Sequence, residues 1–142
     1  MQFVTPEAIA AVMDLSPVPH TLAELESRVR DGLPKSALRA GVAHAVGSTE
    51  ARRTLLASII PEATYKRRRD RLTRDESEKA ERLARVVATA TYVWNDAEDA
   101  RAFLSAPNPL LEGRTPLDVA LTELGARRVE ETLWQLFYGL PV

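Results

Sequence analysis

Hydrophobic positions recur at steps of three and four along most of the chain, which is the spacing of one face of an α-helix. The clearest stretch is 73–95, where Thr73 and Glu76 form a capping-box signature and apolar residues repeat from Ala80 to Trp94. No segment of useful length alternates with the period of two that is typical of a strand. The pattern therefore predicts an all-α fold.

Capping and punctuation residues divide the rest of the chain into shorter helices. A cap followed by proline predicts helix starts at Thr5 and Thr115, and a second capping-box signature predicts one at Thr21. We expect further helices over 34–47, 48–60, 61–71, 97–105 and a last segment that ends at Gly139. Residues 107–109, Pro-Asn-Pro, must form a loop, and the polar segment 30–35 is expected to be a flexible joint.

Composition excludes several kinds of chemistry. With 142 residues, 45% hydrophobic and 27% charged, the chain is expected to form one domain, or two small ones that share a core. The absence of cysteine excludes disulfides and thiolate sites, and His20 and His44 have no partner at ligand spacing. There is no glycine-rich phosphate loop and no nucleophile elbow. We therefore expect a protein that is not an enzyme and holds neither metal nor cofactor.

Two further features bear on location. The longest run without charge, 132–142, has eleven residues, and 86–95 has ten; both are far shorter than the roughly 20 residues that cross a bilayer. The first apolar stretch has no basic residue before it and carries Glu7 and Asp14, so no signal peptide is expected. These features predict a cytoplasmic protein that does not enter the membrane.

Charge is distributed unevenly along the chain. Residues 48–74 carry eight basic and three acidic side chains, a net +5, whereas residues 75–142 carry seven basic and twelve acidic ones, a net −5. A solvated face would mix the two signs. The division suggests two partners of different character.

The basic block contains a helix, a short connection and a second, basic helix, which is the order of a helix-turn-helix. Five residues of the second helix are predicted to contact DNA phosphates or bases: Thr64, Lys66, Arg67, Arg68 and Arg71. Arg52 and Arg53 could hold the DNA backbone, and Tyr65 either contacts phosphate or packs. The alternatives are a solvated basic face or arginines paired with the acidic half, and the expected turn glycine is missing from residues 58–60.

In their order and spacing, several motifs match those of a known family. They are Leu33–Leu38 (LPKSAL), Ile60–Arg68 (IPEATYKRR), Leu72–Glu78 (LTRDESE), Arg82–Val86 (RLARV), Pro107–Leu111 (PNPLL), Gly113–Asp118 (GRTPLD), Thr122–Ala126 (TELGA) and the pair Tyr138-Gly139. Over residues 33–142 the chain resembles the Xre/MbcA/ParS antitoxins of RES–Xre toxin–antitoxin pairs. It departs from the pattern in the missing turn glycine and in Glu112, where a second glycine is common.

The resemblance implies a two-part antitoxin. Residues 33–72 would form a helix-turn-helix region and residues 73–142 a helical toxin-binding domain, while 1–32 form an N-terminal helical segment of unknown role. The implied partner is a RES-domain toxin that degrades NAD or uses it for ADP-ribosylation, and the antitoxin would cover the toxin's active site. The family also implies a homodimer that holds two toxins in a heterotetramer and represses its own operon by binding operator DNA.

Five residues are predicted to bind the toxin: Asn108, Arg114, Trp134, Phe137 and Tyr138. Exposed aromatic residues anchor many interfaces, although Trp134 and Phe137 are three apart and could equally be core. Arg114 is either a side chain inserted into the toxin or an ordinary loop arginine. Two rival functions remain open at this stage: a stand-alone helix-turn-helix regulator, and a protein-interaction module without DNA contact.

Overall fold

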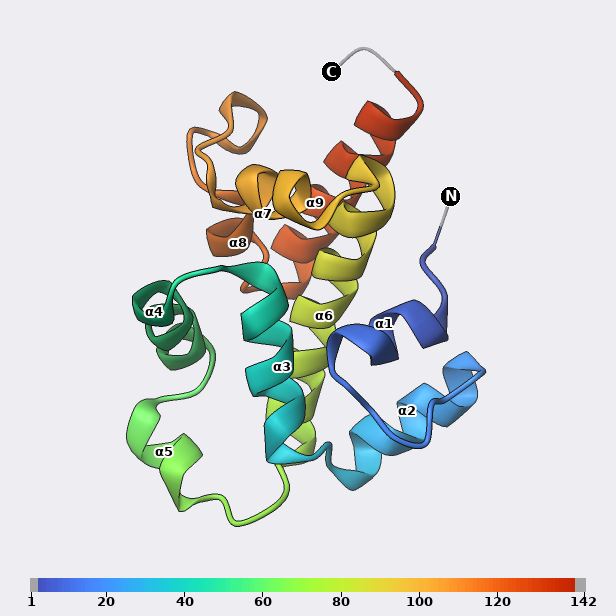
Figure 1. The fold of residues 1–142 in the computed structure, drawn as a ribbon, viewed down its shortest axis with the longest axis vertical. Helices are drawn as coiled ribbons and strands as arrows, with labels where there is room; N and C mark the ends of the chain where they lie inside the picture. Colours follow the sequence, from blue (N-terminus) through green and yellow to red (C-terminus); the bar gives the residue numbers. More distant parts are fainter. Residues whose placement is uncertain (1–2, 140–142) are drawn as a thin grey trace.

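The computed structural model describes residues 3–139, and over that range it consists of helices joined by short connections (Figure 1). The helices are α1 Pro6–Val12, α2 Leu22–Asp31, α3 Lys35–Ala45, α4 Thr49–Ile59, α5 Glu62–Arg67, α6 Arg74–Trp94, α7 Ala97–Ser105, the 3₁₀ helix η1 Pro109–Leu111, α8 Pro116–Val119 and α9 Glu123–Phe137. Within 3–139 no strand forms, and an isolated antiparallel bridge joins Pro34 to Arg71. The prediction of an all-α fold is confirmed.

Side-chain caps fix most helix starts. Thr73 Oγ1 accepts from the backbone N–H of Glu76 at 3.2 Å, and Glu76 Oε1 accepts from that of Thr73 at 2.9 Å, so the capping box is confirmed. Thr21 caps α2, but the Glu24 carboxylate accepts from the backbone N–H of His20 rather than from Thr21. The other side-chain caps are Thr5, Ser48, Asp96, Asn108, Thr115 and Thr122. Each pairs a backbone donor that the helix start would leave free.

Helix α6 runs through the middle of the molecule, and most other helices pack on it (Figure 1). The N-terminal helices α1 and α2 lie on one side, α3 runs beside it, and α7 and α9 cover its C-terminal half. Small or branched side chains of α6, among them Ala80, Ala84, Val86 and Ala90, are almost completely buried, which lets neighbouring helices approach closely. The N-terminal segment 1–32, as far as it is described, therefore shares the core of the rest of the chain.

The connection between α2 and α3 is fixed, so the prediction of a flexible joint at 30–35 was wrong. Gly32 has φ +100°, and a Cβ there would meet the backbone oxygen of Leu72 at 2.7 Å. Leu33 is fully buried; its N–H donates to Ser77 Oγ at 2.8 Å, and its carbonyl accepts from the N–H of Leu72 at 2.9 Å. The polar residues before Gly32 signal exposure, but the leucine after it ties the segment to the start of α6.

Helix α5 is shorter than predicted. Pro61 is its N-cap rather than its first helical residue, and the helix ends at Arg67 instead of residue 71. The backbone of Arg68 is extended, and its carbonyl accepts from Lys35 Nζ at 3.0 Å. The N–H of Lys35 also donates to the carbonyl of Asp70 at 2.8 Å. The residues after Arg67 thus run along the start of α3 and cannot continue the helix.

The C-terminal third follows the predicted pattern closely. Helix α7 covers the expected range, the Pro-Asn-Pro segment forms a loop that leads into η1, and Thr115 starts α8. Helix α9 ends at Phe137, two residues before the predicted Gly139, whose φ is +65°. Val129 and Leu133 of α9 are fully buried against the core. The outer side of the last turns of α9 is left for the aromatic residues described next.

Candidate functional site

Four aromatic side chains meet where the ends of α6 and α9 lie together. This aromatic cluster consists of Tyr92 from α6 and Trp134, Phe137 and Tyr138 from α9 and its C-cap. The ring of Tyr92 is 5.6 Å from that of Trp134 and 5.5 Å from that of Phe137, and Phe137 is 5.2 Å from Tyr138. The tilted and edge-on geometries are those that aromatic pairs favour.

The aromatic cluster faces outward. Tyr92 is 55% exposed, Phe137 43% and Tyr138 52%, and only Trp134 is half-buried. The structure therefore brings three of the predicted toxin-binding residues together at the surface and places Phe137 outside the core. The sequence analysis missed Tyr92. Its signal was available, because Tyr92 lies off the apolar stripe of α6 and an aromatic residue there must be exposed.

A second aromatic pair lies at the end of α6. Trp94 is 41% exposed, and its ring is 6.0 Å from that of Phe103 in α7. The helical spacing had placed Trp94 on the buried stripe of the helix. It falls outside because Asn95, with φ +52°, ends the helix immediately after it, and the chain turns into α7.

The loop 107–115 contains the other two predicted toxin-binding residues. Asn108 Oδ1 accepts from the N–H of Leu110 at 2.9 Å, so its side chain is used to cap η1. The N–H of Asn108 donates to the carbonyl of Arg114 at 3.1 Å, which closes the loop and places these two residues side by side. Arg114 is exposed, with Nη2 3.4 Å from the carbonyl oxygen of Asp118.

Arg128 of α9 ties this loop to the last helix. Its Nη1 and Nη2 donate to the two carboxylate oxygens of Glu112 at 2.9 and 2.7 Å. Glu112 has φ +57°, the left-handed conformation that favours glycine, which explains why a glycine suits this position. The Arg128 contact holds the Glu112 pKa below its ordinary value, since a bidentate guanidinium stabilises the charged carboxylate. Within residues 3–139 no hydrogen bond or ion pair joins the loop to the aromatic cluster, so the two form separate groups on the C-terminal half.

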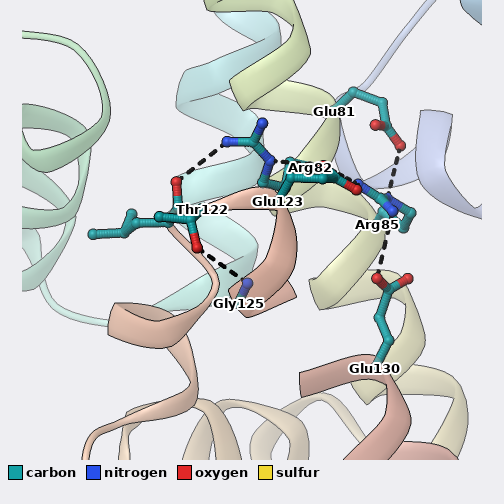
Figure 2. Close-up of polar contacts among 8 residues, drawn as sticks. Glu81, Arg82, Arg85, Thr122, Glu123, Gly125 and Glu130 are labelled. Atoms are coloured by element: carbon teal, nitrogen blue, oxygen red, sulfur yellow. Dashed lines mark hydrogen bonds and ion pairs between the residues drawn. The ribbon is translucent and has the colours of Figure 1, made fainter. Parts of the chain in front are cut away.

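Arginines of α6 hold the start of α9 in place (Figure 2). Arg82 Nε lies 3.1 Å from Glu123 Oε2, and its Nη1 donates to the carbonyl of Leu121 at 3.2 Å. Arg85 reaches three carboxylates: Glu123 at 3.2 Å, Glu130 at 3.4 Å and Glu81 at 3.4 Å. These contacts fix α9 along α6 and thereby bring the aromatic residues at its far end beside Tyr92.

One guanidinium cannot neutralise three carboxylates. Burial raises the pKa of Glu81 and of Glu130, and Arg85 only partly offsets that cost. Burial also disfavours the charged form of Glu123, but Arg85 and Arg82 outweigh it and lower the pKa of Glu123. The network thus contains two guanidiniums and three carboxylates, a formal charge of −1.

The predicted DNA-binding helix is a short, basic projection. Helices α4 and α5 are joined through Ile60 and Pro61, and Lys66 and Arg67 of α5 are exposed. Thr64 is half-buried, with its hydroxyl 3.4 Å from Arg67 Nη2. The structure thus keeps Thr64, Lys66 and Arg67 together on one turn and a half of helix. Tyr65 packs: it is buried, and its hydroxyl donates to the carbonyl of Lys35 at 2.9 Å.

The other two predicted DNA-binding arginines make internal contacts. Arg68 donates two hydrogen bonds to Glu76, at 2.9 and 2.8 Å, and these lower the Glu76 pKa to about 2. Arg71 Nη1 donates to the carbonyl of Gly32 at 2.9 Å. Arg52 also turns inward, to the carbonyls of Val46 and Ala43, whereas Arg53 is exposed. These contacts support the fold around α5, and their roles in DNA binding remain predictions.

Models of known protein families match both halves of the chain. A family model for the antitoxin Xre-like helix-turn-helix domain matches residues 24–85, and one for the antitoxin Xre/MbcA/ParS C-terminal toxin-binding domain matches residues 89–139. The chain belongs to the Xre/MbcA/ParS antitoxin family. It is also similar to a protein named antitoxin Xre from Pseudomonas putida KT2440, with 39% identity over 84 residues. That alignment covers 57% of this chain and 53% of the relative, so the chain spans about half the length of the curated relative it matches.

The two matched antitoxin domains meet inside one helix. The helix-turn-helix match ends at residue 85 and the toxin-binding match begins at residue 89, both within α6. Because α6 also contacts α1, α2 and α3, the helix-turn-helix and the C-terminal domain share a rigid element. The helix-turn-helix match begins in α2, so part of the N-terminal segment that the sequence motifs left unassigned belongs to the matched region.

The match to an antitoxin family agrees with the expectation of a binding protein rather than an enzyme. Across residues 3–139 no cluster of three or more histidine or acidic side chains could hold a metal ion. Among the helices over the same range, none combines the length and the apolar character that crossing a membrane requires.

Proposed function

We propose that this chain is an antitoxin that binds and neutralises a cognate RES-domain toxin, covering the active site at which that toxin uses NAD. In the proposed complex the aromatic cluster of α6 and α9 is the anchor of the interface, and the loop with Asn108 and Arg114 contributes at its edge. A second proposed activity is repression of the chain's own operon through α5.

The aromatic cluster is the observation that carries the proposal. Three of its four rings expose about half of their surface on the domain whose family model is described as toxin-binding. Exposed aromatic groups of this kind are costly in a free protein and are the residue types that dominate binding energy at interfaces. The rings already pack on one another, so little side-chain freedom is lost when a partner covers them.

Charge supports a partner with a basic cleft. Residues 75–142 carry a net charge of −5. A cleft that receives NAD must accommodate an anionic pyrophosphate and is expected to be electropositive. Attraction between the two surfaces would speed association and favour this partner over others.

The DNA-binding proposal rests on a smaller set of cations than the sequence indicated. Lys66 and Arg67 are exposed on α5, and Arg53 and Arg69 are exposed nearby in the chain. Four phosphate contacts by one protomer would give a slope of about −3.6 for the logarithm of affinity against the logarithm of salt concentration. A homodimer that holds two toxins would present two such helices and about twice that slope.

The test of the antitoxin proposal is co-expression with the neighbouring reading frame. We expect a stable complex whose mass by light scattering corresponds to two copies of each chain, and loss of cellular NAD only when this chain is absent. When the variant Phe137→Ser replaces the wild-type chain, cellular NAD should fall again, because the variant no longer neutralises the toxin. Its matched control is Leu124→Ser, because Leu124 is an equally apolar, exposed residue at the opposite end of α9. Failure of the wild-type chain to form a complex or to protect NAD would refute the proposal.

The proposal that α5 binds DNA has a separate test with its own control variant. We expect Arg67→Ala to weaken binding to DNA from upstream of the chain's own gene and to reduce the salt slope by about one per protomer. Arg30→Ala removes an exposed arginine from α2, outside the basic block, and should leave the affinity unchanged. Equal affinity of the Arg67 variant and the wild type would contradict the proposal that α5 contacts DNA.

A further inference from the structure

A groove of about 790 Å³ lies between the N-terminal helices α1 and α2 and the central helices α6 and α9. None of its lining residues belongs to the aromatic cluster or to α5. The groove therefore lies apart from both surfaces proposed above.

The wall formed by the N-terminal segment is apolar. Phe3 is 76% exposed and Leu22 is 69% exposed, although both are large hydrophobic side chains. Leu25 and Ile9 form the buried floor beneath them, and half-buried Val29 extends the strip along α2. Solvent contact by two such residues along one groove indicates a surface that another chain covers.

The opposite wall is charged and has an excess of carboxylates. Glu78 and Glu81 come from α6, and Glu123 and Glu130 come from α9. Together with Glu26 on α2 and the arginines Arg82 and Arg85, they give the lining of the whole groove a formal charge of −3. Arg85 already contacts three of these carboxylates, at 3.2 to 3.4 Å, so its single positive charge is shared among them. The two arginines of the lining therefore offset only part of its acidic charge.

We propose that the groove binds a cationic amphipathic segment of a partner protein. Apolar side chains of that segment would lie against Phe3 and Leu22, and a lysine or arginine would sit beside Glu81 and Glu130. The two walls run on opposite sides of one groove, which matches the apolar and basic faces of an amphipathic helix. A cation placed there would add the charge that the acidic wall lacks, and the apolar face would remove Phe3 and Leu22 from water.

The test uses a defined peptide and the full chain. The probe is a fluorescein-labelled helical peptide of 14 residues with leucine on one face and arginine on the other, and its binding is followed by fluorescence anisotropy. Leu22→Ser and Glu81→Gln should each weaken binding about tenfold, because one removes apolar contact and the other removes charge. Leu110→Ser and Glu50→Gln remove an exposed leucine and an exposed glutamate outside the groove and should have no effect.

Two control peptides separate the groove from general attraction between opposite charges. A peptide with serine in place of every leucine keeps the positive charge, and one with glutamate in place of every arginine keeps the apolar face. Both should bind at least tenfold more weakly than the probe. Absence of probe binding, equal binding of the serine peptide, or equal effects of Leu22→Ser and Leu110→Ser would each overturn the proposal. Leu22→Ser should still form the toxin complex, so the two proposals can fail separately.

Discussion

The Arg68–Glu76 pair gives the sharpest quantitative prediction, because it connects the end of α5 to the start of α6. Glu76 is only 7% exposed, its carboxylate accepts two hydrogen bonds from Arg68 and one from the N–H of Thr73, and its pKa is lowered from 4.5 to about 2. That difference corresponds to roughly 3 kcal/mol of folding free energy, within the range for hydrogen bonds to a charged group. Replacement by glutamine, Glu76→Gln, should remove most of it at pH 7.

The pH dependence identifies the source of that energy. Because the pKa of Glu76 is lower in the folded state, its contribution is complete above about pH 4.5 and is lost as the pH falls from 4.5 towards 2. Urea unfolding followed by circular dichroism should therefore show a gap of about 3 kcal/mol between wild type and variant at pH 7, which narrows below pH 4.5 and closes only as the pH approaches 2. Glu78→Gln is the matched control, since Glu78 is half-exposed and forms a surface ion pair with Arg74; its effect should stay below about 0.5 kcal/mol. A Glu76→Gln gap under 1 kcal/mol at pH 7, or one that is independent of pH, would refute the reasoning.

Three further substitutions test the packing that positions the site. Gly125→Ala should destabilise the fold by about 3 kcal/mol or more in urea unfolding, because the added Cβ would collide with the backbone carbonyl of Val119 at the α8–α9 turn. Gly41→Ala should instead stabilise by roughly 0.5–1 kcal/mol, since its Cβ would only touch Leu83 at 3.6 Å inside helix α3; destabilisation would contradict the packing there. Thr73→Ala should cost about 1 kcal/mol through loss of the α6 cap, and an unchanged urea midpoint would show that the cap contributes nothing.

Helix content and helix starts could be predicted well from the sequence, because their signals are local. A hydroxyl or carboxylate that caps a backbone donor acts within three residues, so Thr73, Thr115 and Thr21 mark helix starts without any tertiary information. The apolar spacing of α6 likewise identified its buried face. These features depend on one segment of chain at a time.

Contacts between distant segments could not be predicted in this way. Arg68 and Arg71 look like phosphate ligands in the sequence, but Glu76 and the carbonyl of Gly32 hold them, and the second of these partners is 39 residues away. The end of α5 follows from the same contacts, since residues 68–71 run back along α3 instead of continuing a helix. The exposure of Tyr92 could be read from its place off the apolar stripe of α6, but its contacts with Trp134 and Phe137 depend on α9 packing beside α6.

Helix α6 physically connects the regions of the two proposed activities, DNA binding and toxin binding. Glu76, in the first turn of α6, holds Arg68 after the proposed DNA-binding helix, and the last turn of α6 presents Tyr92 to the aromatic cluster. Arg85, in the middle of α6, fixes α9. We expect loss of the Glu76 contact to weaken DNA binding while leaving toxin binding intact, because the Arg85 contacts are separate from it.

The central claim is that the aromatic cluster binds the toxin, and titration calorimetry of the purified neighbouring-frame protein tests it most directly. We predict that Phe137→Ser weakens binding by at least tenfold, as expected for loss of an aromatic anchor that the toxin covers, whereas Leu124→Ser on the same helix binds as wild type does. Both variants should unfold at wild-type urea concentrations, since both residues are exposed. Wild-type affinity for Phe137→Ser, or an equal loss for Leu124→Ser, would contradict the claim.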